Sequence, residues 1–333
     1  MSVKTEITEK LTGIPTGKIR TAFYSGDSDG APLIELRDAE CSGRGLVETY
    51  AVFDGIELSF FTLCADKISF KHEPMKGVME INHCHNGRAG LAVNDGNVYL
   101  GAGDLSLNTM DKCADAEMSL PLGYYEGITV CIDLNKLTTN PPDIIKDTGI
   151  TGELLYDKFC KAKAFTTLTG GAKTDGLFAA LYDAPQSMRM PYLKIKTQEL
   201  LLYLYEMEFA AEQKYPYPPD QIDTVKKIHE LLTQNLDKRY TIEDLSKMFL
   251  MNTTTLKAAF KSVYGVSIAA HVKEHRLEKA AFMLCETDES ISEIARAVGY
   301  ESQSKFTSAF REAYKMLPTD YRKQKTPPQK DIL

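Results

Sequence analysis

The stretch Thr241-Ile242-Glu243-Asp244-Leu245 recurs in altered form as Ser290-Ile291-Ser292-Glu293-Ile294. Each copy is followed by an aromatic and a basic residue, Phe260-Lys261 in the first and Phe310-Arg311 in the second. The two copies are 49 residues apart at their starts and 50 residues apart at these pairs, so the second copy holds one extra residue. This half-repeat predicts two copies of one small helical unit.

Each copy is expected to form a helix, a short turn and a second helix. Thr241 with Asp244, and Ser290 with Glu293, have the spacing of a capping box, in which a hydroxyl and a carboxylate satisfy free N–H groups at a helix start. Gly299 suits the turn of the second copy. Leu250-Met251-Asn252 must form the turn of the first copy, with Asn252 as the expected cap of the helix that follows. The second helices are expected to run to Val263 and Ala313.

A tight helix-turn-helix packs one side of its second helix on the domain and projects the other side outward, which suits the major groove of DNA. Leu256, Ala259 and Phe260 are expected to face inward in the first such helix. The outward positions are polar or small, and those that we expect to contact DNA are Thr253, Thr254, Lys257, Lys261, Ser302, Gln303, Ser304, Lys305, Ser308 and Arg311.

The residues of the second copy match a known signature. The run from Ala295 to Phe306, followed by Phe310-Arg311, Pro318 and Tyr321-Arg322, resembles that of the AraC/XylS transcription regulators. The resemblance covers about residues 220 to 325 and implies two helix-turn-helix motifs joined by a long helix, here from Ser267 to Cys285. Three positions depart from the family pattern: Lys315 replaces Gly, Leu317 replaces Ser or Thr, and Ile268 replaces a frequent Pro.

Charge supports this division only weakly. Residues 220–333 hold 18 Lys and Arg against 16 Asp and Glu, a net charge of +2, whereas the whole chain carries −7. The first 219 residues therefore carry −9. Phosphate binding depends on local basic side chains, so a nearly neutral domain can still bind DNA in a salt-dependent way.

The length of 333 residues and the hydrophobic content of 43% suggest two domains. The prolines of Tyr215-Pro216-Tyr217-Pro218-Pro219-Asp220 indicate a semi-rigid linker. We therefore expect an N-terminal domain at 1–214, a linker at 215–220, a DNA-binding domain at 221–325 and a disordered tail at 326–333.

Short strands with turn signals fill residues 30–145, where we expect a barrel or sandwich. The turn signals are Asn86-Gly87, Asp95-Gly96 and Gly103-Asp104. The segment from Gly87 to Leu105 resembles the cupin-type sensor of many AraC-type regulators, and the run from Pro121 to Ile128 is similar to the branch that includes pyochelin-type siderophore regulators. The predicted fold is thus α+β: an N-terminal cupin-like barrel with a helical dimerisation segment, and an all-α C-terminal domain.

Helices are predicted around Gly152 to Phe165 and Pro191 to Gln213, within a helical region at 150–214. The second has apolar residues on more than one face, so one face could cover the barrel and the other could form a homodimer. Burial of the whole helix in its own core is the alternative.

The triplet His83-Cys84-His85 raises the question of a metal site. In a strand His83 and His85 share one face and Cys84 points to the other, so the triplet supplies two ligands at most, and we expect no metal and no cofactor. A small-molecule effector could contact Arg88, Tyr99 and Tyr124, although each could equally serve a rim salt bridge or the core.

These features predict a DNA-binding transcription regulator controlled by an effector, and not an enzyme. The alternative is a cupin-type metalloenzyme or a repair enzyme fused to a DNA-binding module, but neither a facial set of metal ligands nor an activated Cys is evident. A pure interaction protein would leave the polar helix faces unexplained. Seven widely spaced cysteines, and the lack of a signal peptide or long apolar run, predict a cytoplasmic protein with no membrane association, located at the nucleoid when bound to DNA. Its expected partners are duplex DNA, the effector, a second copy of the chain and, for an activator, RNA polymerase.

Overall fold

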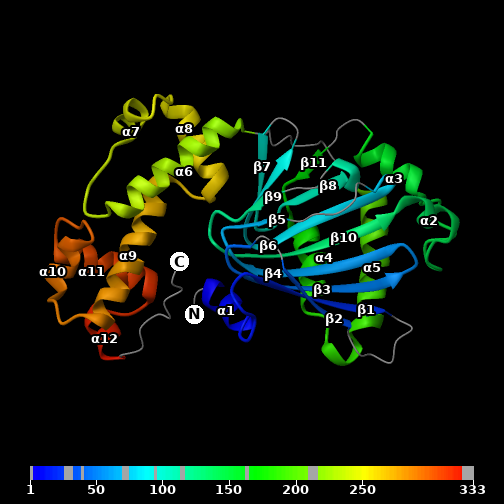
Figure 1. The fold of residues 1–333 in the computed structure, drawn as a ribbon, viewed down its shortest axis with the longest axis horizontal. Coiled ribbons are helices and arrows are strands. Elements are labelled where there is room, and N and C mark those ends of the chain that lie inside the picture. The colour runs from blue at the N-terminus through cyan, green and yellow to red at the C-terminus, as the bar shows by residue number, and fades with distance from the viewer. Residues whose placement is uncertain are drawn as a thin grey trace. The chain divides into compact units, whose positions relative to one another are not determined.

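The computed structural model describes residues 3–25, 33–38, 41–69, 75–93, 96–112, 117–161, 165–208 and 217–324 (Figure 1). The chain divides into two compact units, Met1–Tyr217 and Pro218–Leu333, which are considered separately below. Residues 215 and 216 of the expected linker, and the whole expected tail at 326–333, lie outside the described residues.

The first unit is built on a curled sheet. Its main path runs β11-β8-β6-β10-β4-β3-β1-β2, and β5, β7 and β9 join it off this path. Neighbouring strands are antiparallel except β1 and β3. The strands are β1 (Lys18–Ser25), β2 (Leu33–Asp38), β3 (Arg44–Phe53), β4 (Ile56–Cys64), β5 (Lys67–Ser69), β6 (Val78–Val93), β7 (Gly96–Gly101), β8 (Leu105–Thr109), β9 (Glu117–Ser119), β10 (Tyr125–Asp133) and β11 (Phe165–Leu168).

Helices cover one face of this sheet. The largest core joins Leu58, Ile81 and Val130 of the strands to Phe178 and Leu201 of the helices. A second core, on the part of the sheet that curls toward β5, β7 and β9, contains Cys84, Leu100 and Tyr125. The helices of this unit are α1 (Val3–Lys10), η1 (Met110–Lys112), α2 (Leu134–Thr139), α3 (Gly152–Phe159), α4 (Ala172–Tyr182), η2 (Gln186–Met188) and α5 (Arg189–Glu206).

The long strand β6 belongs to both parts of the sheet, because it bends at Gly87. The backbone of Gly87 has φ +81°, and a Cβ there would lie 2.3 Å from the carbonyl oxygen of Tyr124. The register between β6 and β10 shifts between Glu126, which pairs with Asn86, and Gly127, which pairs with Cys84, so His85 is the extra residue of a β-bulge just before Gly87. The predicted turn at Asn86-Gly87 is therefore wrong. The strands β6 and β7 do pair antiparallel, with Val93 opposite Gly96, although Asp95 of the predicted turn lies outside the described residues. The strand β8 does follow Gly103-Asp104.

The two predicted helices of this unit exist but are shorter than expected. The helix α3 ends at Phe159, whose carbonyl accepts a hydrogen bond from the Thr166 hydroxyl at 2.8 Å, and the chain enters β11 at Phe165. The helix α5 ends at Glu206, because Met207 turns to extended geometry with ψ 113°. Residues 209–213 of the predicted helix lie outside the described residues.

The second unit is helical and contains the predicted duplication. Its helices are α6 (Pro219–Gln234), α7 (Ile242–Met248), α8 (Thr253–Tyr264), α9 (Ile268–Glu286), α10 (Ile291–Ala297), α11 (Gln303–Tyr314) and α12 (Pro318–Lys323). The helix α9 is the predicted joiner, and it contacts α6 and α8 in one half and α10, α11 and α12 in the other. The α+β class is thus confirmed, with a curled sheet in one unit and a helix-turn-helix domain in the other.

Arg276 of α9 ties the two halves of this unit together. Its Nε donates to the carbonyl oxygen of Leu236 at 2.8 Å, and Nη2 donates to that of Lys238 at 3.0 Å, both just after α6. Gly299, in the turn between α10 and α11, lies against this junction with φ +84°, and a Cβ there would lie 2.4 Å from the Leu236 oxygen. The predicted role of Gly299 in the turn is confirmed.

We expect Gly299→Ala to destabilise the second unit by about 2–5 kcal/mol, because it combines a left-handed backbone with a clash against the Leu236 carbonyl. Denaturant unfolding of the two variants would measure this, with Gly149→Ala in the first unit as the control. Gly149 has a similar φ of +77° but no neighbour within 4 Å, so its replacement isolates the backbone cost. Equal losses for the two variants would show that the close approach at Gly299 is unimportant.

Candidate nucleic-acid interface

The first helix-turn-helix consists of α7 and α8. Thr241 and Asp244 form the predicted capping box, and the Asn252 side chain caps α8 by accepting from the Thr255 N–H at 2.8 Å. The turn between the helices is unusual, because Leu250 takes a positive φ of 52° and is 95% exposed. A branched residue pays a steric cost there that a glycine would avoid.

The second helix-turn-helix, α10 and α11, repeats this construction. Ser290 and Glu293 form the second capping box, and the Ser302 hydroxyl caps α11 by accepting from the Lys305 N–H at 3.3 Å. The residue that caps the C-terminal end of α11 is Lys315, with φ +58°. The corresponding residue of α8 is Gly265, with φ +82°. The departure from the family pattern at Lys315 therefore leaves the left-handed helix end in place.

Each second helix has one buried and one exposed face. Leu256, Ala259 and Phe260 of α8 are fully buried, as predicted, and so are Phe306 and Phe310 of α11. Thr253 is half-buried, and the other nine residues nominated for DNA contact are exposed: Thr254, Lys257, Lys261, Ser302, Gln303, Ser304, Lys305, Ser308 and Arg311. The packing thus leaves both nominated faces available to a partner.

The charged residues on these faces differ in their surroundings. Lys305 donates to Glu301 at 2.5 Å, and this hydrogen bond holds the pKa of Glu301 below its usual range. Glu301 also lies 3.6 Å from Arg239. Such exposed ion pairs contribute about 0–1 kcal/mol, so Lys305 can exchange Glu301 for a phosphate at little cost. Lys257, Lys261 and Arg311 form no ion pair with any other described residue.

In the first unit, the three residues nominated for effector contact do not form one group. Arg88 of β6 and Tyr99 of β7 share a neighbourhood: burial lowers the pKa of the Arg88 guanidinium, and the nearby Asp104, Cys84 and Tyr99 oppose that shift. Tyr124 packs elsewhere, against the cluster of Ile7, Leu11 and Ile14 at α1. The structure therefore brings together two of the three.

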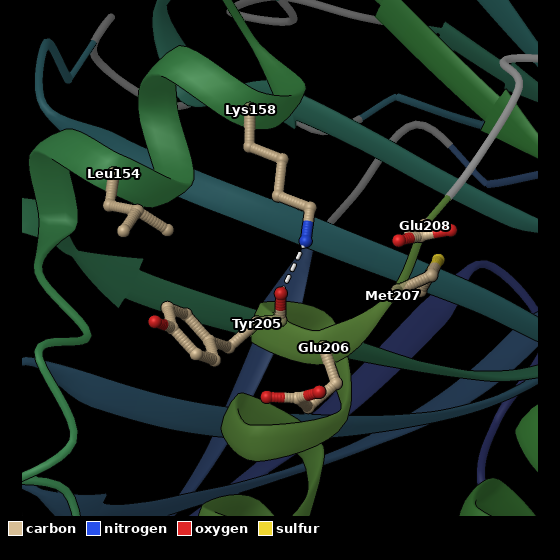
Figure 2. A pocket seen from close by; sticks show the side chains of 6 residues that line it. All are labelled: Leu154, Lys158, Tyr205, Glu206, Met207 and Glu208. Carbon is tan, nitrogen blue, oxygen red and sulfur yellow. Dashed lines mark hydrogen bonds between the residues drawn. The ribbon is translucent and has the colours of Figure 1, made fainter.

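A surface hollow lies at the end of α5, and none of the nominated effector residues lines it. It is lined by Leu154, Lys158, Tyr205, Glu206, Met207 and Glu208 (Figure 2). The Lys158 amine points to the C-terminus of α5 and donates to the carbonyl oxygens of Leu204 at 2.8 Å and Tyr205 at 2.5 Å. These bonds satisfy carbonyls that the helix leaves without partners, so Lys158 serves to cap α5.

The strand prediction for His83 and His85 is confirmed. The His83 ring stacks on Phe178 at 4.1 Å and the His85 ring stacks on Tyr182 at 4.0 Å, while Cys84 lies in the other core. Burial lowers the pKa of His83 to about 4, and His85 adds to the shift. Sequence reasoning missed another group, His229, His271 and His275, whose signal was the spacing of His271 and His275 by one helical turn.

Comparison with known proteins places the second unit in a recognised class. Residues 245–324 match the family model described as a helix-turn-helix domain, which extends from α7 to the end of α12. The chain is 35% identical over 136 residues to the HTH-type transcriptional regulator ExsA of Pseudomonas aeruginosa, covering 39% of this chain and 47% of ExsA. It is 32% identical over 101 residues to the transposon Tn10 TetD protein of Escherichia coli, covering 30% of this chain and 73% of TetD.

A putative AraC-like transcription regulator of Streptomyces lividans is 35% identical over 91 residues, covering 27% of this chain and 30% of that protein. The second unit is therefore a DNA-binding domain of the helix-turn-helix class. The chain belongs to the AraC/XylS family of transcriptional regulators.

The match to these relatives covers only part of their length. The chain spans less than half the length of ExsA and about a third of the Streptomyces protein. Relatives such as ExsA are named as transcription regulators rather than enzymes, which supports the prediction that the chain is not an enzyme. Within the described ranges, no helix combines the length and apolar character needed to cross a membrane.

Proposed function

We propose that the protein binds specific duplex DNA sequences and regulates transcription under the control of a small-molecule effector bound by its first unit. One observation carries the proposal: two helix-turn-helix motifs on a shared core each expose a polar second-helix face. Lys257 and Lys261 lie on the first face, and Gln303 and Arg311 lie on the second.

The duplication explains how one chain could recognise an extended site. Recognition helices that enter successive segments of the major groove on one side of DNA are about 34 Å apart along its axis. The helix α9 packs against both motifs, so it sets their separation. One domain would therefore cover two groove segments without a second copy of the chain.

The exposed side chains divide between two tasks. Gln303 is the first residue of α11, and its amide suits adenine, while Lys257 near the start of α8 suits guanine. Lys261 and Arg311 lie in the last turns of their helices and suit phosphate oxygens. Ser302 would contact DNA only with the hydrogen-bonding capacity that remains after it caps α11.

Selection of bound sequences from a random duplex pool by the full-length protein, near physiological salt, tests this assignment. We expect enrichment of a repeated half-site. Gln303→Ala and Lys257→Ala should each relax the preference at one position and weaken binding by about 1–3 kcal/mol, because each removes a base contact. Gln234→Ala, at an exposed position at the end of α6, is the control and should reproduce the wild-type motif.

An enriched motif that is identical for wild-type protein and both variants would refute the assigned recognition faces. Binding that is only salt-sensitive, with no motif even when candidate effectors are present, would refute sequence-specific recognition.

The effector site is proposed for the curled sheet of the first unit, with Arg88, Tyr99 and Tyr124 as its contacts. The placement of Arg88 beside Tyr99 supports a shared role for these two residues. Membership of the branch that includes pyochelin-type siderophore regulators is a narrower proposal, which rests on the run from Pro121 to Ile128. An effector acts only if it binds two arrangements of the protein with different affinity.

For an active effector we expect a change of about 5–150-fold in DNA affinity, measured by titration of labelled operator with and without the compound. Tyr99→Phe should weaken the response more than Tyr156→Phe, a control at an exposed tyrosine of α3. Unchanged DNA affinity, half-site spacing and transcription across candidate effectors would refute effector control.

Dimerisation through the region of α5, predicted at 191–213, is the remaining part of the proposal. One face of α5 packs into the core through Leu193, Leu200, Leu201 and Leu204. Ile195 is 60% exposed and Tyr205 is 36% exposed, so the helix also presents apolar surface outward. This partial exposure favours a pairing role over complete burial. Two copies would then place their DNA-binding units on repeated half-sites.

We expect Ile195→Asp to convert a dimer into a monomer in sedimentation velocity measurements, because it would place a carboxylate in an apolar interface. Met75→Asp, at another exposed apolar residue of the same unit, is the matched control and should leave the mass unchanged. A monomeric wild-type protein, or an Ile195→Asp variant that stays dimeric, would contradict pairing through this face.

A further inference from the structure

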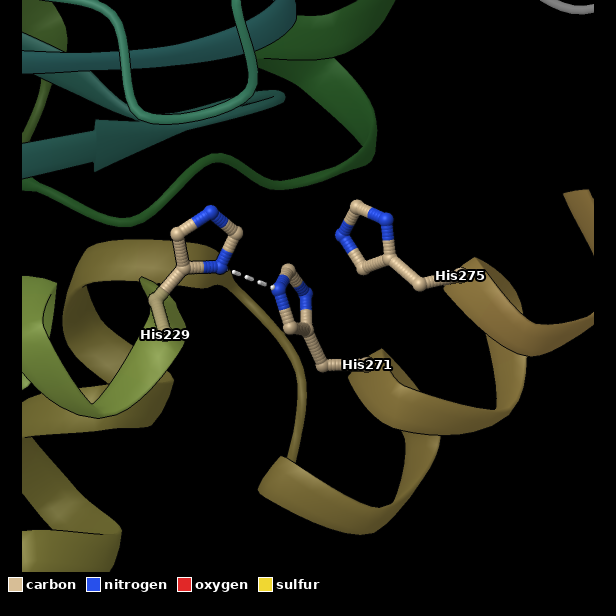
Figure 3. A group of neighbouring side chains, drawn as sticks. All are labelled: His229, His271 and His275. Atoms are coloured by element: carbon tan, nitrogen blue, oxygen red, sulfur yellow. Dashed lines mark hydrogen bonds between the residues drawn. The ribbon is translucent and has the colours of Figure 1, made fainter. Parts of the chain in front are cut away.

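Three histidines of the second unit converge outside the nominated DNA-contact faces. His229 comes from α6, and His271 and His275 come from α9. One ring nitrogen of each lies within 4.8 Å of those of the other two (Figure 3). Nδ1 of His229 and Nε2 of His271 are 2.8 Å apart.

The packing of α6 on α9 produces this arrangement. His271 and His275 are four residues apart on α9, so their side chains lie on one face of that helix. The His229 ring stacks on Tyr264 at 4.7 Å, and the His271 ring meets Phe260 edge to face at 5.3 Å. Because these aromatic residues of α8 restrict the rings, the cluster is formed by the folded domain itself.

The cluster has an enclosed side and an accessible side. His271 is 3% exposed, whereas His229 is half-buried and the His275 side chain is 33% exposed. Burial lowers the pKa of His229 to about 4 and that of His271 to about 3, with further lowering by neighbouring His275 in both cases.

A hydrogen bond between the rings of His229 and His271 accounts for their 2.8 Å contact. It does not explain why a ring nitrogen of His275 also lies within 4.8 Å of theirs. Zinc–nitrogen bonds are about 2.0–2.1 Å long, so two ligands of a tetrahedral ion lie about 3.3 Å apart. The observed separations, from 2.8 Å to at most 4.8 Å, span this value. Small ring rotations would bring all three nitrogens to bonding distance of one ion.

A carboxylate completes the pattern. Glu278 Oε2 lies 3.5 Å from His275 Nδ1, and Figure 3 shows the other ring nitrogen of His275 turned toward His271. A carboxylate behind a metal-binding histidine orients the ring and increases its basicity.

We propose that His229, His271 and His275 form a binding site for one divalent transition-metal ion of the zinc class, with a fourth position open to solvent. Three imidazoles suit zinc, and they also suit copper and nickel. The ion would tie α6 to α9 beside the end of α8. Since the unfolded chain lacks a preformed site, binding would stabilise the second unit. The proposal does not depend on the effector or on the DNA sequence recognised.

Titration of the metal-free full-length protein with Co²⁺ tests the site, followed by competition with Zn²⁺. We expect the visible absorption of tetrahedral Co²⁺ at one ion per chain, its loss on addition of Zn²⁺, and a rise in the Tm of the second unit. His275→Gln, at a partly exposed ligand, should weaken binding at least about 100-fold, and Glu278→Gln should weaken it about 10-fold.

His85→Gln is the matched control, because His85 lies in the first unit beside Tyr182 and should leave metal binding unchanged. Retained helical circular dichroism and retained DNA binding would show that His275→Gln is folded, and His229→Gln provides a second ligand variant. The proposal is overturned if the wild-type protein shows no tetrahedral Co²⁺ absorption, if both ligand variants bind as tightly as wild type, or if only His85→Gln abolishes binding.

Discussion

The fold of the second unit depends on Arg276 of α9, which joins the segment after α6 to the turn between α10 and α11. Its guanidinium bonds to the carbonyl oxygens of Leu236 and Lys238, which follow α6, and its Nη2 atom lies close to the turn at Gly299. A lysine could not reproduce this, because only the planar guanidinium presents several donors in a fixed orientation. One side chain of α9 thereby connects the end of α6 to the second helix-turn-helix. Further along α9, Leu277, Ala280, Ala281 and Leu284 pack against Ile294, Phe306 and Phe310, so the same helix also supplies the core of the second motif.

Because α9 packs against both motifs, it holds the two exposed helix faces at a fixed spacing. A polar helix face on a mobile element would bind phosphates through charge alone, whereas two faces held by one core must match groove segments at a set spacing. In the first unit, the bend at Gly87 has a comparable role, because it lets β6 pair with β10 and β8 before the bend and with β7 beyond it. The two cores on either side of that strand, around Phe178 and around Leu100, are therefore linked by continuous backbone.

Sequence reasoning succeeded where the deciding interactions are local. The two capping boxes, the Asn252 cap and the Gly299 turn each involve residues within a few positions of one another. It failed where distant residues decide the outcome. Asn86-Gly87 has the composition of a turn, but pairing with β10 continues the strand through it. Phe165 starts a strand because β8 offers it a partner, and α5 stops where Lys158 caps it. The histidine cluster was missed because His229 is 42 residues away from His271.

The nominated DNA-contact residues are also not equivalent, and the structure separates them by what each already does. Ser302 caps α11, and Lys305 pairs with Glu301, which also lies near Arg239. Both side chains therefore already interact within the folded domain. Glu301 would repel a phosphate placed near the start of α11, unless a cation compensates its charge. If DNA draws Lys305 to a phosphate, Arg239 still lies near Glu301 and limits that repulsion. Arg239 is thus suited to let the start of α11 approach the DNA backbone, although no sequence motif singled it out. Lys257, Lys261 and Arg311 need no such exchange, because none of them forms an ion pair within the described part of the chain.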